Sequence, residues 1–201
     1  MNDRCMLVIP VLLALTGCAS LLPPPAETRE FALTPAAPEP GVAPMPVLNL
    51  TVAIDAPYDG NRLLVRDLGG ELRPYAGGRW AAPLKSLLAA SWSFSLERAA
   101  IAGQVLSGTA RGGHYPLLAL QVREFFAAAE AQPAEIRLSL VAAYQADSDA
   151  APEVRTFSVR RPADLDDIAA LAAGFDAANQ ALVSEALHWL NELNRGASRG
   201  P

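Results

Sequence analysis

Few residues of this chain are of the types that do acid–base or metal chemistry, and they are widely spaced. The sequence has two histidines, His114 in a glycine-rich segment and His188 in a segment with helical periodicity. Neither has a cysteine or a second histidine at metal-ligand spacing, which argues against a zinc site. Asp164, Asp166 and Asp167 could form a paired-carboxylate site. Helix capping explains them better, because they directly precede an apolar helical stripe.

Motifs for phosphate binding and for serine hydrolysis are also missing. The glycine-containing runs at 107–109 and 111–113 lack the Lys-Ser/Thr pair of a phosphate-binding loop, and the sequence has no G-x-S-x-G motif. The three tryptophans, Trp80, Trp92 and Trp189, fit a core or an interface better than a ligand-stacking platform. The sequence therefore predicts no catalytic residue, no metal site and no cofactor.

Cys18 is the residue for which the sequence predicts covalent chemistry. The stretch Leu15-Thr16-Gly17-Cys18 resembles a lipobox, at which the signal peptide of a bacterial lipoprotein is cut just before the cysteine. The apolar run before it, residues 6–15, is much shorter than the roughly 20 residues of a membrane-spanning helix. We therefore expect cleavage between Gly17 and Cys18, and a diacylglyceryl group attached to the cysteine sulfur. The alternative is an uncleaved N-terminus with an unmodified cysteine.

The composition is that of an acidic chain without a disulfide framework. The 201 residues carry a formal net charge of −5, and the longest basic run is Arg160-Arg161. This distribution argues against nucleic-acid binding. Of the two cysteines, Cys5 would leave with the signal peptide and Cys18 would carry lipid. We therefore expect packing alone to stabilise the fold.

Local composition divides the chain into four parts. We expect a signal peptide at 1–17, the lipidated cysteine with a proline-rich tether at 18–46, a folded domain at 47–195 and a flexible tail at 196–201. As an extended polyproline-like chain, the tether would reach about 80–90 Å. Phe31-Ala32-Leu33 differs from the rest of the tether, since it could join the domain as an edge strand.

The patterns within the domain predict strands and two long helices. Branched or alternating apolar residues predict strands at 47–54, 62–67, 71–75, 104–106, 118–125, 136–142 and 154–160. The second and third of these form a hairpin, the last three an antiparallel meander, and residues 76–80 break the sheet. Apolar periodicity predicts helices at 83–100 and 165–194, the second capped by Asp164. We expect one sandwich-like α/β domain, with a mixed, mainly antiparallel sheet packed by two main helices.

The order of these elements resembles the ABC-type transport auxiliary lipoproteins over residues 15–194. The resemblance is carried by short motifs in matching order, namely Phe31-Ala32-Leu33, Arg62-Leu63-Leu64-Val65, Tyr75 with Arg79-Trp80 and Pro83, and Leu118-x-Leu120-x-Val122-x-x-Phe125. It implies a fold similar to the N-terminal domain of TolB. It also implies that Tyr75, Arg79 and Trp80 are candidate docking residues for a partner. Local packing that seats the first helix on the sheet is the favoured explanation of these three.

The resemblance implies a non-catalytic role in the bacterial envelope. Such lipoproteins accompany an ABC permease, its ATPase and a periplasm-spanning protein with an MCE domain, in systems that move lipids or other hydrophobic molecules. Ala19 follows the lipidated cysteine where an aspartate would retain the protein in the inner membrane. We therefore expect the outer membrane, with the domain on its periplasmic face. Whether the chain forms a homo-oligomer stays open.

Two other functions also stay open. A structural or assembly lipoprotein of another envelope complex would share the anchor and the tether, so the sequence barely separates it from the transport role. A periplasmic lipoprotein enzyme would need convergent polar groups in a cleft. The sequence does not group such residues, and His114 beside a buried carboxylate would be needed to support an enzyme.

Overall fold

A computed structural model describes residues 28–36, 45–108 and 115–197 of the chain. The elements follow one another as β1 (Arg29–Phe31), β2 (Met45–Ile54), β3 (Arg62–Arg66), β4 (Leu72–Trp80), α1 (Leu84–Arg98), β5 (Ala102–Ser107), β6 (Leu117–Ala128), β7 (Glu135–Gln145), β8 (Glu153–Pro162) and α2 (Ile168–Ala197). The predicted lipidation and cleavage site at Gly17 and Cys18 lies outside the described residues.

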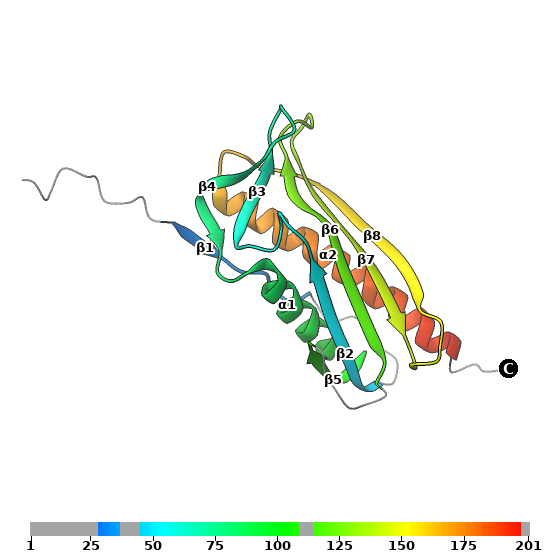
Figure 1. The fold of residues 1–201 in the computed structure, drawn as a ribbon. Helices are drawn as coiled ribbons and strands as arrows, with labels where there is room; N and C mark the ends of the chain where they lie inside the picture. The colour runs from blue at the N-terminus through cyan, green and yellow to red at the C-terminus, as the bar shows by residue number, and fades with distance from the viewer. Residues whose placement is uncertain (1–27, 37–44, 109–114, 198–201) are drawn as a thin grey trace, which may run out of the picture.

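The eight strands of the described residues form one sheet, and the long strand β6 lies at its centre (Figure 1). On one side, β6 pairs antiparallel with β7, which pairs antiparallel with β8. On the other side, β6 pairs parallel first with β2 and then with β3, so the sheet forks into two arms. β5 extends the arm of β2, whereas β4 and β1 extend the arm of β3.

The α/β fold predicted from the sequence is confirmed. The predicted hairpin is β3–β4, and the predicted meander is β6-β7-β8, which contains the two longest pairings of the sheet. Four further pairings are parallel, which makes the sheet mixed. Phe125 lies out of phase with the first half of β6 because the register shifts between Val122 and Glu124, as a β-bulge does.

The two helices lie side by side on one face of the sheet (Figure 1). Alternate residues of β7, from Ile136 to Tyr144, are buried in the main core, which also contains the apolar stripes of α1 and α2. The intervening residues of β7 point to the opposite face and are partly exposed. Among the described elements, no helix covers that opposite face, which we call the uncovered face.

The sheet does not break at residues 76–80, so this prediction is wrong. β4 continues through two glycines to Trp80. Gly77 has φ +79°, which an L side chain rarely adopts. A Cβ on Gly78 would lie 2.6 Å from Ile168 Cγ1 and 3.1 Å from the ring of Phe31. Glycines usually weaken a strand, but here they let β4 bend and let α2 and β1 approach closely.

The second long helix begins later than predicted, and its cap differs. Asp164 Oδ1 accepts hydrogen bonds from the N–H groups of Asp166 and Asp167, at 2.9 and 3.3 Å, and so closes a turn before the helix. Asp167 Oδ1 accepts from Ala169 N–H at 2.8 Å and caps α2 at Ile168. Capping of the second long helix is therefore confirmed for Asp167, whereas Asp164 caps the preceding turn.

Candidate functional site

Residues 29–36, which the sequence analysis places in the tether, are seated on the folded domain. β1 pairs parallel with the end of β4, from Arg29 beside Gly78 to Phe31 beside Trp80. This pairing confirms an edge strand in this segment. Beyond β1, Leu33 and Ala36 are buried in the main core. We call residues 29–36 the strap, and the fold therefore includes residues well before 47.

Side chains from both helices hold the strap through hydrogen bonds. On α2, Asp176 accepts from the Thr34 N–H at 2.7 Å and from the Thr34 hydroxyl at 2.6 Å. On α1, the Ser91 hydroxyl donates to the Thr34 carbonyl oxygen at 2.9 Å, and Ser95 Oγ accepts from the Ala36 N–H at 3.0 Å. These partners replace the water that the strap loses where it becomes buried.

A buried polar cluster beneath the strap joins α1 to α2. Asn179 is fully buried, and its amide donates to Ser91 Oγ at 3.0 Å. Its carbonyl oxygen accepts from Trp92 Nε1 at 3.3 Å. A buried polar group left without a partner costs about 1–3 kcal/mol, so this cluster favours one alignment of the two helices. Asn179 was not predicted from the sequence, although a polar residue within an apolar helical stripe is a signal of such a contact.

We expect Asp176→Ala to loosen the strap. The variant removes the acceptor of two hydrogen bonds from Thr34, and hydrogen bonds to charged groups contribute about 1.5–3 kcal/mol when buried. Because this pair is partly exposed, we expect a local destabilisation of about 1–2 kcal/mol, which raises opening of the strap about 5–30-fold. Hydrogen exchange at residues 29–36 measures this, with Asp176→Asn as the control that keeps one acceptor. Unchanged protection would mean that apolar burial alone holds the strap.

Trp80, one of the three candidate docking residues, lies in the core. Its side chain is 1% exposed, and its ring packs edge-to-face against Phe125 and Phe175, with centroid distances of 5.9 and 5.7 Å. Trp92 and Trp189 are also buried, which confirms that the tryptophans serve the core rather than a ligand platform. The Trp80 ring can therefore support a surface but is not part of one.

Tyr75 and Arg79, the other two candidates, reach the surface, and each bonds to a neighbouring segment of the chain. The Tyr75 hydroxyl donates to the Leu165 carbonyl oxygen at 2.5 Å, ahead of α2. The Arg79 guanidinium forms an ion pair with Glu30 of the strap at 2.6 Å. These are packing contacts, but they join β4 to the strap and to the segment before α2, whereas the sequence predicted packing that seats the first helix on the sheet. Docking of a partner through Tyr75 or Arg79 stays a prediction.

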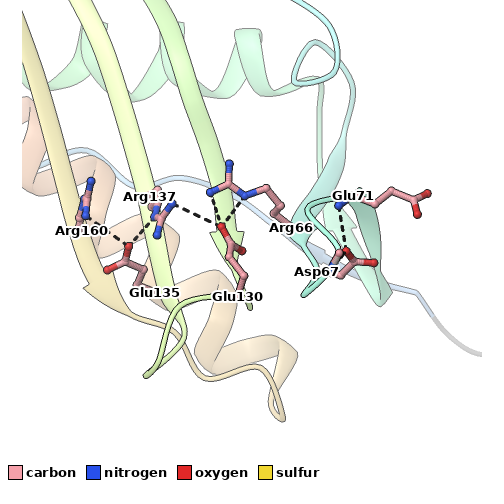
Figure 2. A network of polar contacts seen from close by, with 8 residues as sticks. Arg66, Asp67, Glu71, Glu130, Glu135, Arg137 and Arg160 are labelled. Atoms are coloured by element: carbon pink, nitrogen blue, oxygen red, sulfur yellow. Dashed lines mark hydrogen bonds and ion pairs between the residues drawn. The ribbon is translucent and has the colours of Figure 1, made fainter.

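Charged side chains form a row across one end of the uncovered face (Figure 2). Arg66 of β3 pairs with Glu130, just after β6. Arg137 of β7 lies 3.5 Å from Glu130 and 2.5 Å from Glu135. Arg160 of β8 completes the row, 3.8 Å from Glu135. We call these five residues the charged row; their alternating charges largely compensate one another.

The charged row borders a small second core on the uncovered face. Leu64, Phe126 and Ala128 are buried there, with the Tyr58 ring stacked on Phe126. The Arg66 guanidinium lies 4.4 Å from the centroid of the Phe126 ring. Burial raises the pKa of Tyr58, which stays neutral near pH 7. Arg66 therefore shields apolar side chains on a face that lacks a helix among the described elements.

The hydrogen bond from Arg66 holds the pKa of Glu130 below its ordinary value of 4.5. A carboxylate with a lowered folded-state pKa stabilises the fold above its unfolded pKa, and this stabilisation is lost as the pH falls through the folded value. We therefore expect Glu130→Gln to be less stable than the natural protein near neutral pH. The difference should shrink below pH 4.5. Urea unfolding of both proteins across this range measures it, and a difference independent of pH would contradict the assignment.

The described residues contain no assembled acid–base or metal centre. No group of three or more His, Cys, Asp or Glu side chains among them could hold a metal ion. His188 is 67% exposed, with Nε2 at 3.3 Å from Glu192 Oε1 one helical turn away. Solvent screens such a pair. His114 lies outside the residues that the structure describes. In the same part of the chain, neither helix is long and apolar enough to cross a membrane.

Comparison with protein families identifies the chain. The family model described as "ABC-type transport auxiliary lipoprotein component" matches residues 31–186, more than three quarters of the sequence. The chain belongs to this family. The match begins at Phe31, the last residue of β1, and ends in α2, so it includes β2 to β8 and α1, and it confirms the family resemblance noted from the sequence. A search of curated proteins gave no match to this auxiliary lipoprotein.

Two solved structures share the fold of this auxiliary lipoprotein. A crystal structure of a Xanthomonas campestris protein of the family DUF330, which is the same family, is 27% identical with a TM-score of 0.72. The similarity covers 86% of this chain and 99% of that one. A crystal structure of an uncharacterized protein is 15% identical, with a TM-score of 0.61, over 83% of this chain and 99% of that one. At that identity the second structure shows the fold alone.

Proposed function

We propose that this auxiliary lipoprotein is the lipid-anchored, non-catalytic subunit of an MCE-type ABC transport system. The system would move lipids or other hydrophobic molecules across the bacterial envelope. The family match carries the proposal, since its description names a transport component. The charged row and the caps before α2 are consistent with a non-catalytic role, because their carboxylates pair with arginines or cap backbone N–H groups. ATP hydrolysis belongs to another subunit.

Cys18 provides the anchor in this proposal. After cleavage between Gly17 and Cys18, the acylated cysteine holds the protein in the periplasmic leaflet of the outer membrane. Two or more acyl chains give stable anchoring where a single chain gives marginal, reversible binding. The strap gives the anchor a fixed point of attachment on the domain, because residues 29–31 pair with β4 and Thr34 bonds to both helices.

The partners are the periplasm-spanning MCE-domain protein and, through it, the permease and the ATPase. An anchored domain raises the local concentration of the transporter end at the outer membrane without any chemistry of its own. We place partner docking around Tyr75 and Arg79, which are at the surface next to the strap, with Trp80 supporting them from the core. Assembly of several copies is compatible with this arrangement.

A genetic experiment tests the transport role. The gene for this chain and each MCE-domain gene of the same genome are deleted singly and together, and envelope permeability is measured with detergent and with large antibiotics. If the two genes belong to one system, the envelope of one double-deletion strain should be no more permeable than that of the more permeable single-deletion strain. Additive defects in every pair would contradict the proposal and favour a structural or assembly lipoprotein of another envelope complex.

A further inference from the structure

We propose that the end of the domain with the β3–β4 turn faces the anchoring leaflet, and that Leu68 at the tip of this turn inserts among the lipids. The inference rests on the proposed lipid anchor at Cys18. It adds an orientation of the domain and a second, non-covalent membrane contact. Three observations support it: the direction of the strap, the length of chain before the strap, and the form of the turn.

The register of β1 fixes the side from which the anchor chain arrives. β1 runs parallel to β4, with Arg29 opposite Gly78. Following β4 backwards from Gly78 leads to Leu72 and to the β3–β4 turn at 67–71. In Figure 1, β1 begins beside β4, on the half of the molecule that contains this turn, whereas β5 lies toward the other end. β1 therefore begins on the side of the domain where this turn lies.

Only a short chain separates the strap from the anchor. Residues 19–28 are ten residues, which span about 31 Å as an extended polyproline-like chain. The strap begins near the start of α2, since Gly78, opposite Arg29, closely approaches Ile168. The 30 residues of α2 extend about 45 Å from there. If instead the C-terminal end of α2 faced the leaflet, the start of the strap would lie about 45 Å from it. The ten residues between the strap and Cys18 could not span that distance.

Leu68 lies in the β3–β4 turn, between β3 and β4. Leu68 is 78% exposed, more than any other exposed large apolar side chain of the described residues. Asp67 Oδ1 accepts from the N–H groups of Gly69 and Glu71, at 2.9 and 3.0 Å, which fixes the turn (Figure 2). Arg73 pairs with the carboxylates of Asp67 and Glu71, at 3.1 and 2.6 Å. The turn therefore exposes an apolar side chain beside partly compensated charges.

The proposed occupant is a lipid leaflet rather than a protein, because the short chain holds this end at the membrane. The same end has Asp164, Asp166 and Asp167 as well as the charged row, so its charges are mixed, and the whole chain is acidic. We therefore expect insertion to depend on the apolar side chain and not on anionic lipid. Val154, which is 61% exposed at the start of β8, provides a matched apolar position at the opposite end of the sheet.

A fluorescence experiment on the full-length acylated protein tests the orientation. Leu68→Cys and Val154→Cys are each labelled with an environment-sensitive dye; the sequence has only Cys5 and Cys18 besides, so the mature protein offers one thiol. The proteins are reconstituted into phosphatidylethanolamine–phosphatidylglycerol vesicles with and without nitroxide-labelled lipid. We expect quenching at position 68 to exceed that at position 154 about threefold or more, as for a side chain among headgroups and acyl chains.

The outcomes separate the orientation from the anchor. Equal quenching at positions 68 and 154 would overturn the orientation while flotation of the protein with the vesicles still supports the anchor. Failure to float would overturn the anchor itself. If the dye at position 68 is unquenched in vesicles but becomes shielded in native membranes, a protein partner covers Leu68, and the assignment to lipid is wrong.

Discussion

Replacing Trp80 with alanine should lower the free energy of unfolding of the domain by about 3–5 kcal/mol. The ring is 1% exposed and lies edge-to-face on Phe125 and Phe175, which are themselves stacked at 5.2 Å. Alanine would leave a cavity where β4, β6 and α2 meet. Since small domains are stable by about 5–15 kcal/mol in total, this loss is a large share. Urea unfolding followed by circular dichroism measures it.

Two control variants test whether the loss of stability comes from the buried aromatic ring. Phe94→Ala, at an aromatic side chain that is 56% exposed on α1, should change the free energy of unfolding by less than about 0.5 kcal/mol. Trp80→Phe should lose less than Trp80→Ala, because it keeps an aromatic ring. If Trp80→Ala stays as stable as the natural protein, Trp80 is not the packing residue that its burial indicates.

Replacing Cys18 with alanine should move nearly all of the protein out of the outer-membrane fraction. The variant cannot form the thioether, and no other acylation site is proposed. Each buried methylene of an acyl chain contributes about 0.8 kcal/mol to membrane binding, so losing the whole anchor outweighs the single contact at Leu68. Fractionation with immunoblotting measures the location, and mass spectrometry of the natural protein should show loss of residues 1–17 and a diacylglyceryl addition at Cys18.

Cys5→Ala is the matched control for this experiment. Cys5 lies upstream of the predicted cleavage site, so its replacement should change neither the mass of the mature protein nor its location. If Cys18→Ala stays in the outer-membrane fraction as fully as the natural protein, the anchor is not at this residue and the proposed function loses its membrane attachment.

The sequence predicted the elements whose signal is local. Buried and partly exposed residues alternate regularly along β7. The residues predicted to face the core, Ile136, Leu138 and Leu140, do so. The apolar stripe of α2 was also predicted, with Leu171, Phe175 and Leu182 in the core. Each of these patterns repeats over several turns or residue pairs, so a single irregularity does not hide it.

What the sequence could not predict depends on contacts between distant segments. Gly77 and Gly78 look like a sheet breaker locally, and only the approach of Ile168 shows why β4 continues through them. The bonds that hold the strap join Thr34 to Asp176, which are 142 residues apart, and no local period encodes them.

The candidate site was predicted in its parts but not in its arrangement. Tyr75, Arg79 and Trp80 were singled out together from the family resemblance, yet Trp80 is buried whereas the other two reach the surface. The charged row was missed because its members come from three strands and a connection, and side chains at a sheet edge become neighbours only when register is known. The register between two neighbouring strands cannot be read from the sequence of either strand alone.

Capture of the intact lipoprotein from crosslinked native membranes, with mass spectrometry of the captured proteins, is the most direct test of the transport role. We predict that an MCE-domain protein and an ABC permease are recovered together, that Arg79→Glu reduces both, and that Cys18→Ala weakens capture by removing the anchor. Recovery of outer-membrane assembly or peptidoglycan-binding proteins alone, with no MCE-domain protein, would contradict the transport role and leave a structural lipoprotein.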